Sequence, residues 1–93
     1  MKAIWKDRII AESNQTIELE GYRYFPKDAV NQEYLRESET PYHCPWKGDA
    51  LFYDIIMDGT VHKDAAWEYP VPKEKASFIK DHIAFWKGVK VER

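Results

Sequence analysis

The chain has little of what would crosslink it or anchor it in a membrane. Its 93 residues include one cysteine, so it has no pair from which to form an internal disulfide. The opening residues, MKAIWKDRII, lack the apolar core of a signal peptide. No apolar run reaches the roughly 20 residues that a spanning helix needs, because Asp54, Asp58 and Lys80 interrupt the longest ones. We therefore expect a cytoplasmic protein with no membrane partner.

Positive charge is not in excess either. Fourteen Lys and Arg residues stand against sixteen Asp and Glu residues, which gives a formal net charge of −2. Domains that bind nucleic acid usually carry a basic surface that neutralises phosphates. The composition therefore predicts no nucleic-acid partner.

Aromatic residues, by contrast, are abundant. The chain has four Trp, six Tyr and four Phe residues, and each such ring can bury roughly 150–250 Å² of surface. A chain of this length can form only one hydrophobic core. Residues 1–93 are therefore predicted to be a single domain whose core is built largely from aromatic rings.

Alternation of apolar and polar residues predicts strands along most of the chain. We expect the N-terminal quarter to be an antiparallel meander of short strands at residues 2–5, 8–13, 16–21 and 22–25. The strongest signal covers residues 49–59, where Asp58-Gly59 is typical of a tight hairpin turn that leads into a returning strand at 60–70. Residues 83–92 are predicted to be a closing hairpin with Lys87-Gly88 at its turn.

Helical signals are few. Residues 27–35 suit a short helix or a pair of turns, and residues 73–82 suit a short helix. Residues 36–45 are polar and contain two prolines, which predicts a surface loop. The predicted fold class is mainly β (a β-rich α+β domain) with one or two short helices.

Four segments spread over the chain carry a family resemblance: YRYFPKDAVNQEYL, CPWKGDALFYDI, DAAWEYPVP and HIAFWKGVKV. They resemble the small prokaryotic proteins grouped as domain of unknown function 427, which is also labelled a nucleotidyltransferase family. The family landmarks fall on Tyr24–Pro26, Cys44–Gly48 and Ala66–Pro70 without departure. The resemblance implies a β-tent fold, in which two antiparallel sheets lean together. It implies no mechanism, because the family's activity is not established.

Some β-tent relatives hold zinc with paired Cys-x-x-Cys knuckles, but this chain lacks such pairs. A structural zinc site needs four Cys or His ligands in close pairs. Cys44 has only His43 beside it, and His62 and His82 stand alone. Nucleotidyl transfer would need metal-bound carboxylates, and the candidate acids, which fall in no recognisable paired motif, are Asp49, Asp54, Asp58, Asp64 and Glu68. We expect no metal and no cofactor.

The segment HCPWKG at residues 43–48 contains two candidate catalytic residues. Cys44 is a candidate nucleophile or redox centre if Lys47 or His43 stabilises its thiolate; the alternative is a small buried hydrophobe. Pro45 suits a tight turn that presents Trp46 inward. Lys47 lies beside the open backbone of Gly48, where an anion can approach, although a solvated lysine in a turn is the alternative and no phosphate-loop motif is present.

Aromatic residues near these landmarks form a candidate ligand-binding set. Tyr22 and Tyr24 should face one side of their strand, as should Trp67 and Tyr69, because side chains two residues apart share a face. The resulting hypothesis is a cleft between the sheets lined by Tyr24, Trp46, Trp67 and Tyr69, with Lys47 at its mouth. Core packing, with Tyr53 included, is the alternative for the same rings.

Three functions remain open at this point. The leading one is a binding module that takes a small planar or anionic ligand in the aromatic cleft. The second is an enzyme, with thiol or redox chemistry at Cys44 or a nucleotidyltransferase-like activity. The third is a protein-interaction or structural module, including a symmetric homodimer.

Overall fold

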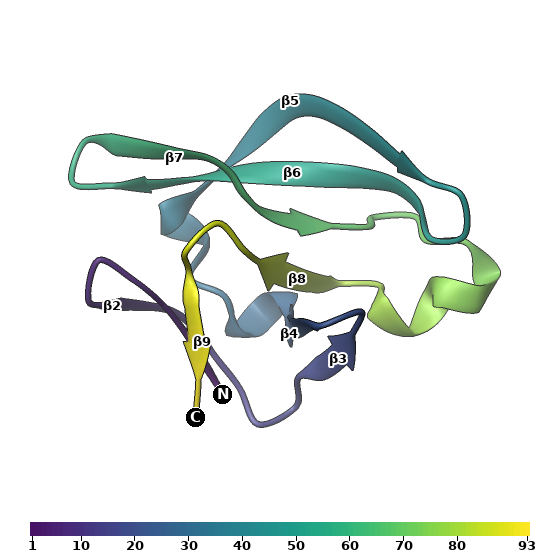
Figure 1. Ribbon diagram of the computed structural model, residues 1–93, viewed down its shortest axis with the longest axis horizontal. Coiled ribbons are helices and arrows are strands. Elements are labelled where there is room, and N and C mark those ends of the chain that lie inside the picture. The colour runs from purple at the N-terminus through teal and green to yellow at the C-terminus, as the bar shows by residue number, and fades with distance from the viewer.

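Two antiparallel sheets make up the protein in a computed structural model that describes all 93 residues (Figure 1). The small sheet has the strand order β2-β1-β9, with bounds Arg8–Glu12, Lys2–Trp5 and Lys90–Glu92. The large sheet has the order β3-β4-β8-β7-β6-β5, with bounds Ile17–Leu19, Tyr22–Pro26, His82–Phe85, Thr60–Glu68, Gly48–Met57 and Leu35–Cys44. The predicted mainly β fold is confirmed.

The helical segments are three short 3-10 turns: η1 (Lys27–Ala29), η2 (Gln32–Tyr34) and η3 (Glu74–Ile79). The pair of turns expected at residues 27–35 is therefore confirmed, and the helix expected at 73–82 is reduced to a 3-10 segment. None of these segments has the length or apolar character of a membrane-crossing helix.

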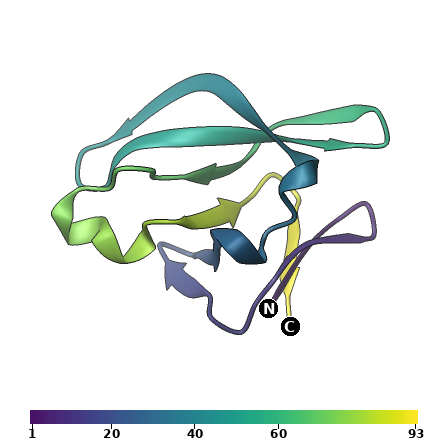
Figure 2. The same ribbon diagram turned by 180° about the vertical axis from the view of Figure 1, so that it is seen from behind.

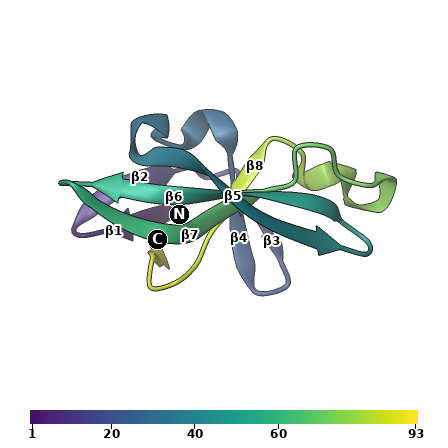
Figure 3. The ribbon, with the colours of Figure 1, turned by 90° about the horizontal axis from the view of Figure 1, so that it is seen from above.

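The large sheet bends strongly. In Figure 1, β5, β6 and β7 run along the top of the molecule, while β8, β4 and β3 lie beneath them. Seen from behind, η1 lies in front beside the lower strands, and η2 lies higher, where the chain enters β5 (Figure 2). From above, β3 and β4 run across the direction of β5 and β6 (Figure 3). The small sheet lies at one end, where the two termini come together (Figure 1).

The alternation of side chains divides the core into two clusters. The main cluster joins the small sheet to one face of the large sheet and contains Ala3, Ile10, Ala11, Phe25, Val30, Tyr53, Ile55, Met57, Ala65, Ala66, Ile83, Phe85 and Val89. The second cluster, called the pocket cluster, takes from β4, β7 and β8 residues adjacent in sequence to those of the main cluster. It contains Tyr24, Cys44, Trp67, Tyr69, Ala76, Ile79 and Ala84. Because successive strand residues point to opposite faces, Tyr24 and Phe25 enter different clusters.

Local turns follow the sequence prediction, whereas two strand pairings do not. The turns at Lys6-Asp7 and Asp58-Gly59 have positive φ at both residues and join antiparallel neighbours, as expected. The predicted N-terminal meander is wrong as one sheet, because β2 and β3 belong to different sheets. The predicted hairpin at 83–92 is also wrong: β8 pairs with β4 and β7, while β9 pairs with β1.

The surface loop predicted at residues 36–45 is wrong as well. This segment is most of strand β5, the edge strand of the large sheet, and it pairs with β6. Only Ser38 and Cys44 are buried in it, because an edge strand on a curved sheet exposes most of its side chains. Proline is found in sheets mainly on edge strands and at bulges, and Pro41 lies on this edge strand directly after an irregularity in its pairing with β6.

Candidate functional site

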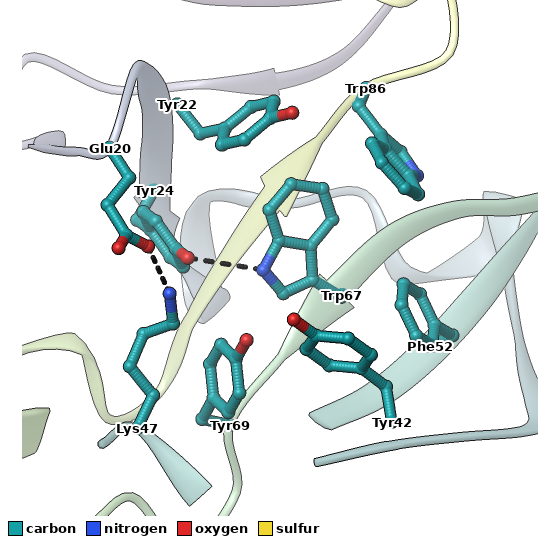
Figure 4. A pocket seen from close by; sticks show the side chains of 9 residues that line it. All are labelled: Glu20, Tyr22, Tyr24, Tyr42, Lys47, Phe52, Trp67, Tyr69 and Trp86. Atoms are coloured by element: carbon teal, nitrogen blue, oxygen red, sulfur yellow. Dashed lines mark hydrogen bonds and ion pairs between the residues drawn. The ribbon is translucent and has the colours of Figure 1, made fainter. Parts of the chain in front are cut away.

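An aromatic cavity of about 260 Å³ lies over the pocket cluster (Figure 4). Its walls come from β4, β5, β6 and β7, from the β3–β4 turn, from the corner between β5 and β6, and from the residues that directly follow β7 and β8. The nine lining residues are Glu20, Tyr22, Tyr24, Tyr42, Lys47, Phe52, Trp67, Tyr69 and Trp86. Seven are aromatic, and two are charged.

Strand register explains why the rings gather here. Phe52 of β6 pairs with Trp67 of β7, and Trp67 pairs with Ala84 of β8. Ala84 in turn pairs with Tyr24 of β4. The small side chain of Ala84 allows the indole of Trp67 and the phenol of Tyr24 to approach across it. Trp67 Nε1 consequently donates a hydrogen bond of 3.2 Å to the Tyr24 hydroxyl.

The rings pack mainly edge to face, which leaves faces and edges turned toward the cavity. Trp67 is perpendicular or nearly so to Tyr22, at 4.9 Å between centroids, and to Trp86, at 5.4 Å. Phe52 is nearly parallel to Trp86 at 6.4 Å. Such pairs stabilise each other by roughly 0.5–1.5 kcal/mol beyond their buried area. The aromatic wall is therefore preformed.

A buried ammonium lies at the polar end of the cavity. Lys47 is only 7% exposed, and its Nζ lies 5.2 Å from the ring centroid of Trp46 and 5.6 Å from that of Tyr69. It donates a short hydrogen bond to the Glu20 carboxylate (Figure 4). Burial alone would lower the pKa of Lys47, but the bond to Glu20 and neighbouring charge outweigh it and raise the pKa. Lys47 is therefore positively charged at neutral pH.

Tyrosine hydroxyls add donors to this end. The Tyr24 hydroxyl accepts from Trp67, so its own proton is free to be donated to a third group. The Tyr69 hydroxyl has no hydrogen-bond partner within the protein and points into the cavity (Figure 4). Burial raises the pKa of both phenols, so both are protonated at neutral pH. The polar end thus offers mainly donors.

The corner that carries Lys47 is a tight connection between β5 and β6. Cys44 pairs with Gly48, which has a φ of +112° and lies so close to the next segment that a Cβ there would be 3.3 Å from the Val71 carbonyl oxygen. The Lys73 backbone N–H donates to the Lys47 carbonyl at 2.9 Å, and Lys73 Nζ donates to the Pro45 carbonyl at 2.6 Å. The corner is thus held by the residues that follow the end of β7.

This corner reverses one sequence expectation. Trp46, predicted to point inward, is 37% exposed and does not line the cavity, whereas Lys47 is the inward residue. The alternative of a solvated lysine is therefore wrong. Trp46 covers the outer side of the ammonium instead.

Cys44 is buried and lies in the pocket cluster without lining the cavity. A thiol in this position behaves as a small hydrophobe in the wall. We predict that its alkylation by a neutral reagent in the native protein is at least about a hundredfold slower than in urea, because it requires local opening. Mass spectrometry over a time course measures both rates. Similar rates would show an accessible thiol and return Cys44 to the list of reactive residues.

The remaining candidates lie outside the cavity. Tyr53 belongs to the main cluster and donates to the buried carboxylate of Glu68, which also pairs with Lys27 at 3.0 Å. His62 stacks on Trp5 at 4.2 Å. Nowhere do three His, Cys, Asp or Glu side chains gather in a way that could hold a metal ion. The candidate acids Asp54 and Asp58 are paired with cations, Arg36 and Arg8.

Part of this cavity was predicted from the sequence. Tyr24, Lys47, Trp67 and Tyr69 line it together, as does Tyr22. Four lining residues were not predicted: Glu20, Tyr42, Phe52 and Trp86. Alternation along β6 and after β8 could have indicated Phe52 and Trp86. Tyr42 was hidden by the loop prediction, and Glu20, in a turn, carries no local signal.

Comparison with known proteins adds a family but no activity. No curated protein matches the chain. A family model described as Domain of unknown function (DUF427), with the label NTP_transf_9, matches residues 1–93. With the whole chain matched and the family landmarks in place, this protein belongs to the DUF427 family.

Proposed function

We propose that the protein is a binding module whose aromatic cavity takes a small planar molecule bearing an anionic group. The observation that carries this proposal is the buried ammonium of Lys47, paired with Glu20 at one end of a cavity whose other lining residues are all aromatic. A buried cation in an apolar wall costs desolvation free energy, and a ligand anion is one way to offset it. The rings supply the flat apolar surface that a planar body needs.

The charges and donors favour an anion over a cation as the ligand. An aromatic cage for a cation needs an unopposed negative charge or ring faces alone. Here the one carboxylate, Glu20, is already paired with Lys47. The hydroxyls of Tyr24 and Tyr69 each have a proton to donate. The unused hydrogen-bonding groups at the polar end are therefore donors, which bind a ligand group that accepts hydrogen bonds, such as an anion.

A thermal-shift screen tests the proposal, with nucleotides, planar heterocyclic carboxylates and sugar phosphates as probes. A ligand at a hundred times its dissociation constant stabilises the native state by about 2.7 kcal/mol, which raises the Tm of a domain this size by roughly 10–20 °C. We expect a dose-dependent shift from planar anions and none from their neutral analogues. Isothermal calorimetry then measures the dissociation constant.

Lys47→Met is the matched variant, because methionine keeps the apolar stem against Tyr69 and removes the charge. We expect it to fold, since Glu20 is half exposed and can be solvated, and to lose at least about tenfold in affinity. Lys80→Met, on the exposed surface, is the control. Equal affinity in Lys47→Met, or no binding of any probe by calorimetry, contradicts the proposal.

A further inference from the structure

We propose that the ligand is an aromatic monocarboxylate, whose carboxylate displaces Glu20 and takes its place on Lys47. This inference rests on the proposed function and specifies its ligand. In the unbound protein, the Glu20 carboxylate then occupies the position on Lys47 that the ligand carboxylate takes when it binds. Glu20 closes the polar end of the cavity as long as no ligand is bound.

The two partners of the ion pair differ in how firmly they are held. Lys47 is 7% exposed and lies against the rings of Trp46 and Tyr69. The Glu20 side chain is 50% exposed and projects from the two-residue turn between β3 and β4. Glu20 can therefore rotate into solvent at little cost, whereas Lys47 cannot. A competing anion would displace Glu20 and leave Lys47 in place.

Charge balance selects the class of anion. Lys47 and Glu20 are the only charged residues among the nine that line the cavity. With Glu20 displaced, one negative charge neutralises the site, which a carboxylate supplies. A phosphate monoester carries about −1.5 to −2 charges at pH 7, so it would leave uncompensated negative charge among aromatic rings. With Glu20 retained, any added anion would be repelled.

The hydrogen-bonding groups agree with a carboxylate. A carboxylate has two oxygens that accept about four hydrogen bonds. In Figure 4 the Lys47 Nζ and the Tyr24 hydroxyl both lie on the cavity side of the Glu20 carboxylate, and the Tyr69 hydroxyl also points toward the cavity. A carboxylate that reaches slightly deeper than Glu20 would accept from the ammonium and from these phenols. Its aromatic body would then extend toward Trp67, Phe52 and Trp86.

The test compares three probes of one shape with different head groups: indole-3-carboxylate, indole-3-carboxamide and indole-3-phosphonate. Isothermal calorimetry gives their dissociation constants for the natural protein and for Glu20→Gln. We expect the carboxylate to bind most tightly, and Glu20→Gln to bind it roughly 3- to 10-fold more tightly than the natural protein. Glu18→Gln, on the same hairpin but paired with Arg23, is the control and should leave the affinity unchanged.

A second readout follows the displaced side chain itself. The hydrogen bond from Lys47 lowers the pKa of Glu20, with the indole of Trp46 contributing. When the ligand takes over Lys47, the Glu20 pKa should rise toward its ordinary value, which carboxyl-carbon NMR measures during titration. A pKa that stays low with ligand bound would show that Glu20 remains on Lys47.

These experiments distinguish failure of the Glu20-displacement proposal from failure of the proposed ligand-binding function. Unchanged or weaker carboxylate binding by Glu20→Gln would show that Glu20 is not displaced, and tighter binding of the phosphonate would overturn the choice of carboxylate. In both cases the cavity would still be a ligand site. No binding of any planar anion to the natural protein or to Glu20→Gln would instead contradict the proposed function itself.

Discussion

Replacing Trp67 by alanine should lower the free energy of unfolding by about 3–5 kcal/mol. Trp67 is 7% exposed and packs with Tyr24, Tyr69 and Ala84 in the pocket cluster. Its removal leaves a large void and strips the Tyr24 hydroxyl of its donor. For a domain of this size the change corresponds to a fall in Tm of roughly 12 °C or more, which calorimetry measures.

Trp46→Ala is the matched control for Trp67→Ala. Trp46 is 37% exposed and lies outside both core clusters, so its truncation should cost less than about 1.5 kcal/mol. Equal losses from the two variants would contradict the assignment of Trp67 to the core.

The burial of Trp67 also means that Trp67→Ala cannot isolate binding from folding. Tyr42→Ala, at a residue that lines the cavity but is 52% exposed, is the better binding variant.

The second large effect is expected at Asp54, whose carboxylate is buried at an irregularity in the β6–β7 pairing. It accepts from the Asp64 backbone N–H at 2.9 Å and from Arg36 at 3.2 Å, and Lys63 lies at 3.4 Å. Asp54→Ala leaves the Asp64 N–H without an acceptor. We expect a loss of about 2–3 kcal/mol in urea unfolding at pH 7.

The same carboxylate should make stability depend on acid. Burial would raise the pKa of Asp54, but the Asp64 N–H, Arg36 and Lys63 outweigh burial and lower it. The unfolded chain therefore binds the proton more readily, so this contribution is present above pH about 4 and is lost as the pH falls through the folded-state pKa. Asp54→Asn keeps an acceptor without the titration. Urea unfolding from pH 2 to 7 should show a shallower acid slope for this variant.

The pKa of Asp64 is lowered too: burial would raise it, but hydrogen bonds from Ser38 and Thr40 and the nearby lysines outweigh burial. The free energy of unfolding of Asp54→Asn should therefore still fall somewhat with acid. Identical slopes in the variant and the natural protein would contradict the role given to Asp54. The network also bears on the cavity, because Trp86 Nε1 donates to the Asp64 carbonyl at 2.6 Å. Asp54 and Trp86 thus form hydrogen bonds to the backbone of the same residue, Asp64.

Local patterns in the sequence were enough to predict most strands, the tight turns and half of the cavity. Alternation places Tyr22 with Tyr24 and Trp67 with Tyr69, because the period of two depends only on neighbours along one strand. The turn at Asp58-Gly59 is similarly local, since the two residues themselves tolerate positive φ. These features do not require knowledge of which strand lies beside which.

Sheet membership and the polar end of the cavity depended on contacts between distant segments. Strand β9 pairs with β1 and not with β8, which precedes it in the sequence. Residues 36–45 form a strand only because β6 lies beside them. The inward position of Lys47 follows from the link between its corner and the segment at Val71 and Lys73. Glu20 reaches Lys47 across 27 positions in the chain. Pairing and burial between remote segments set these features, and no local pattern in the sequence records them.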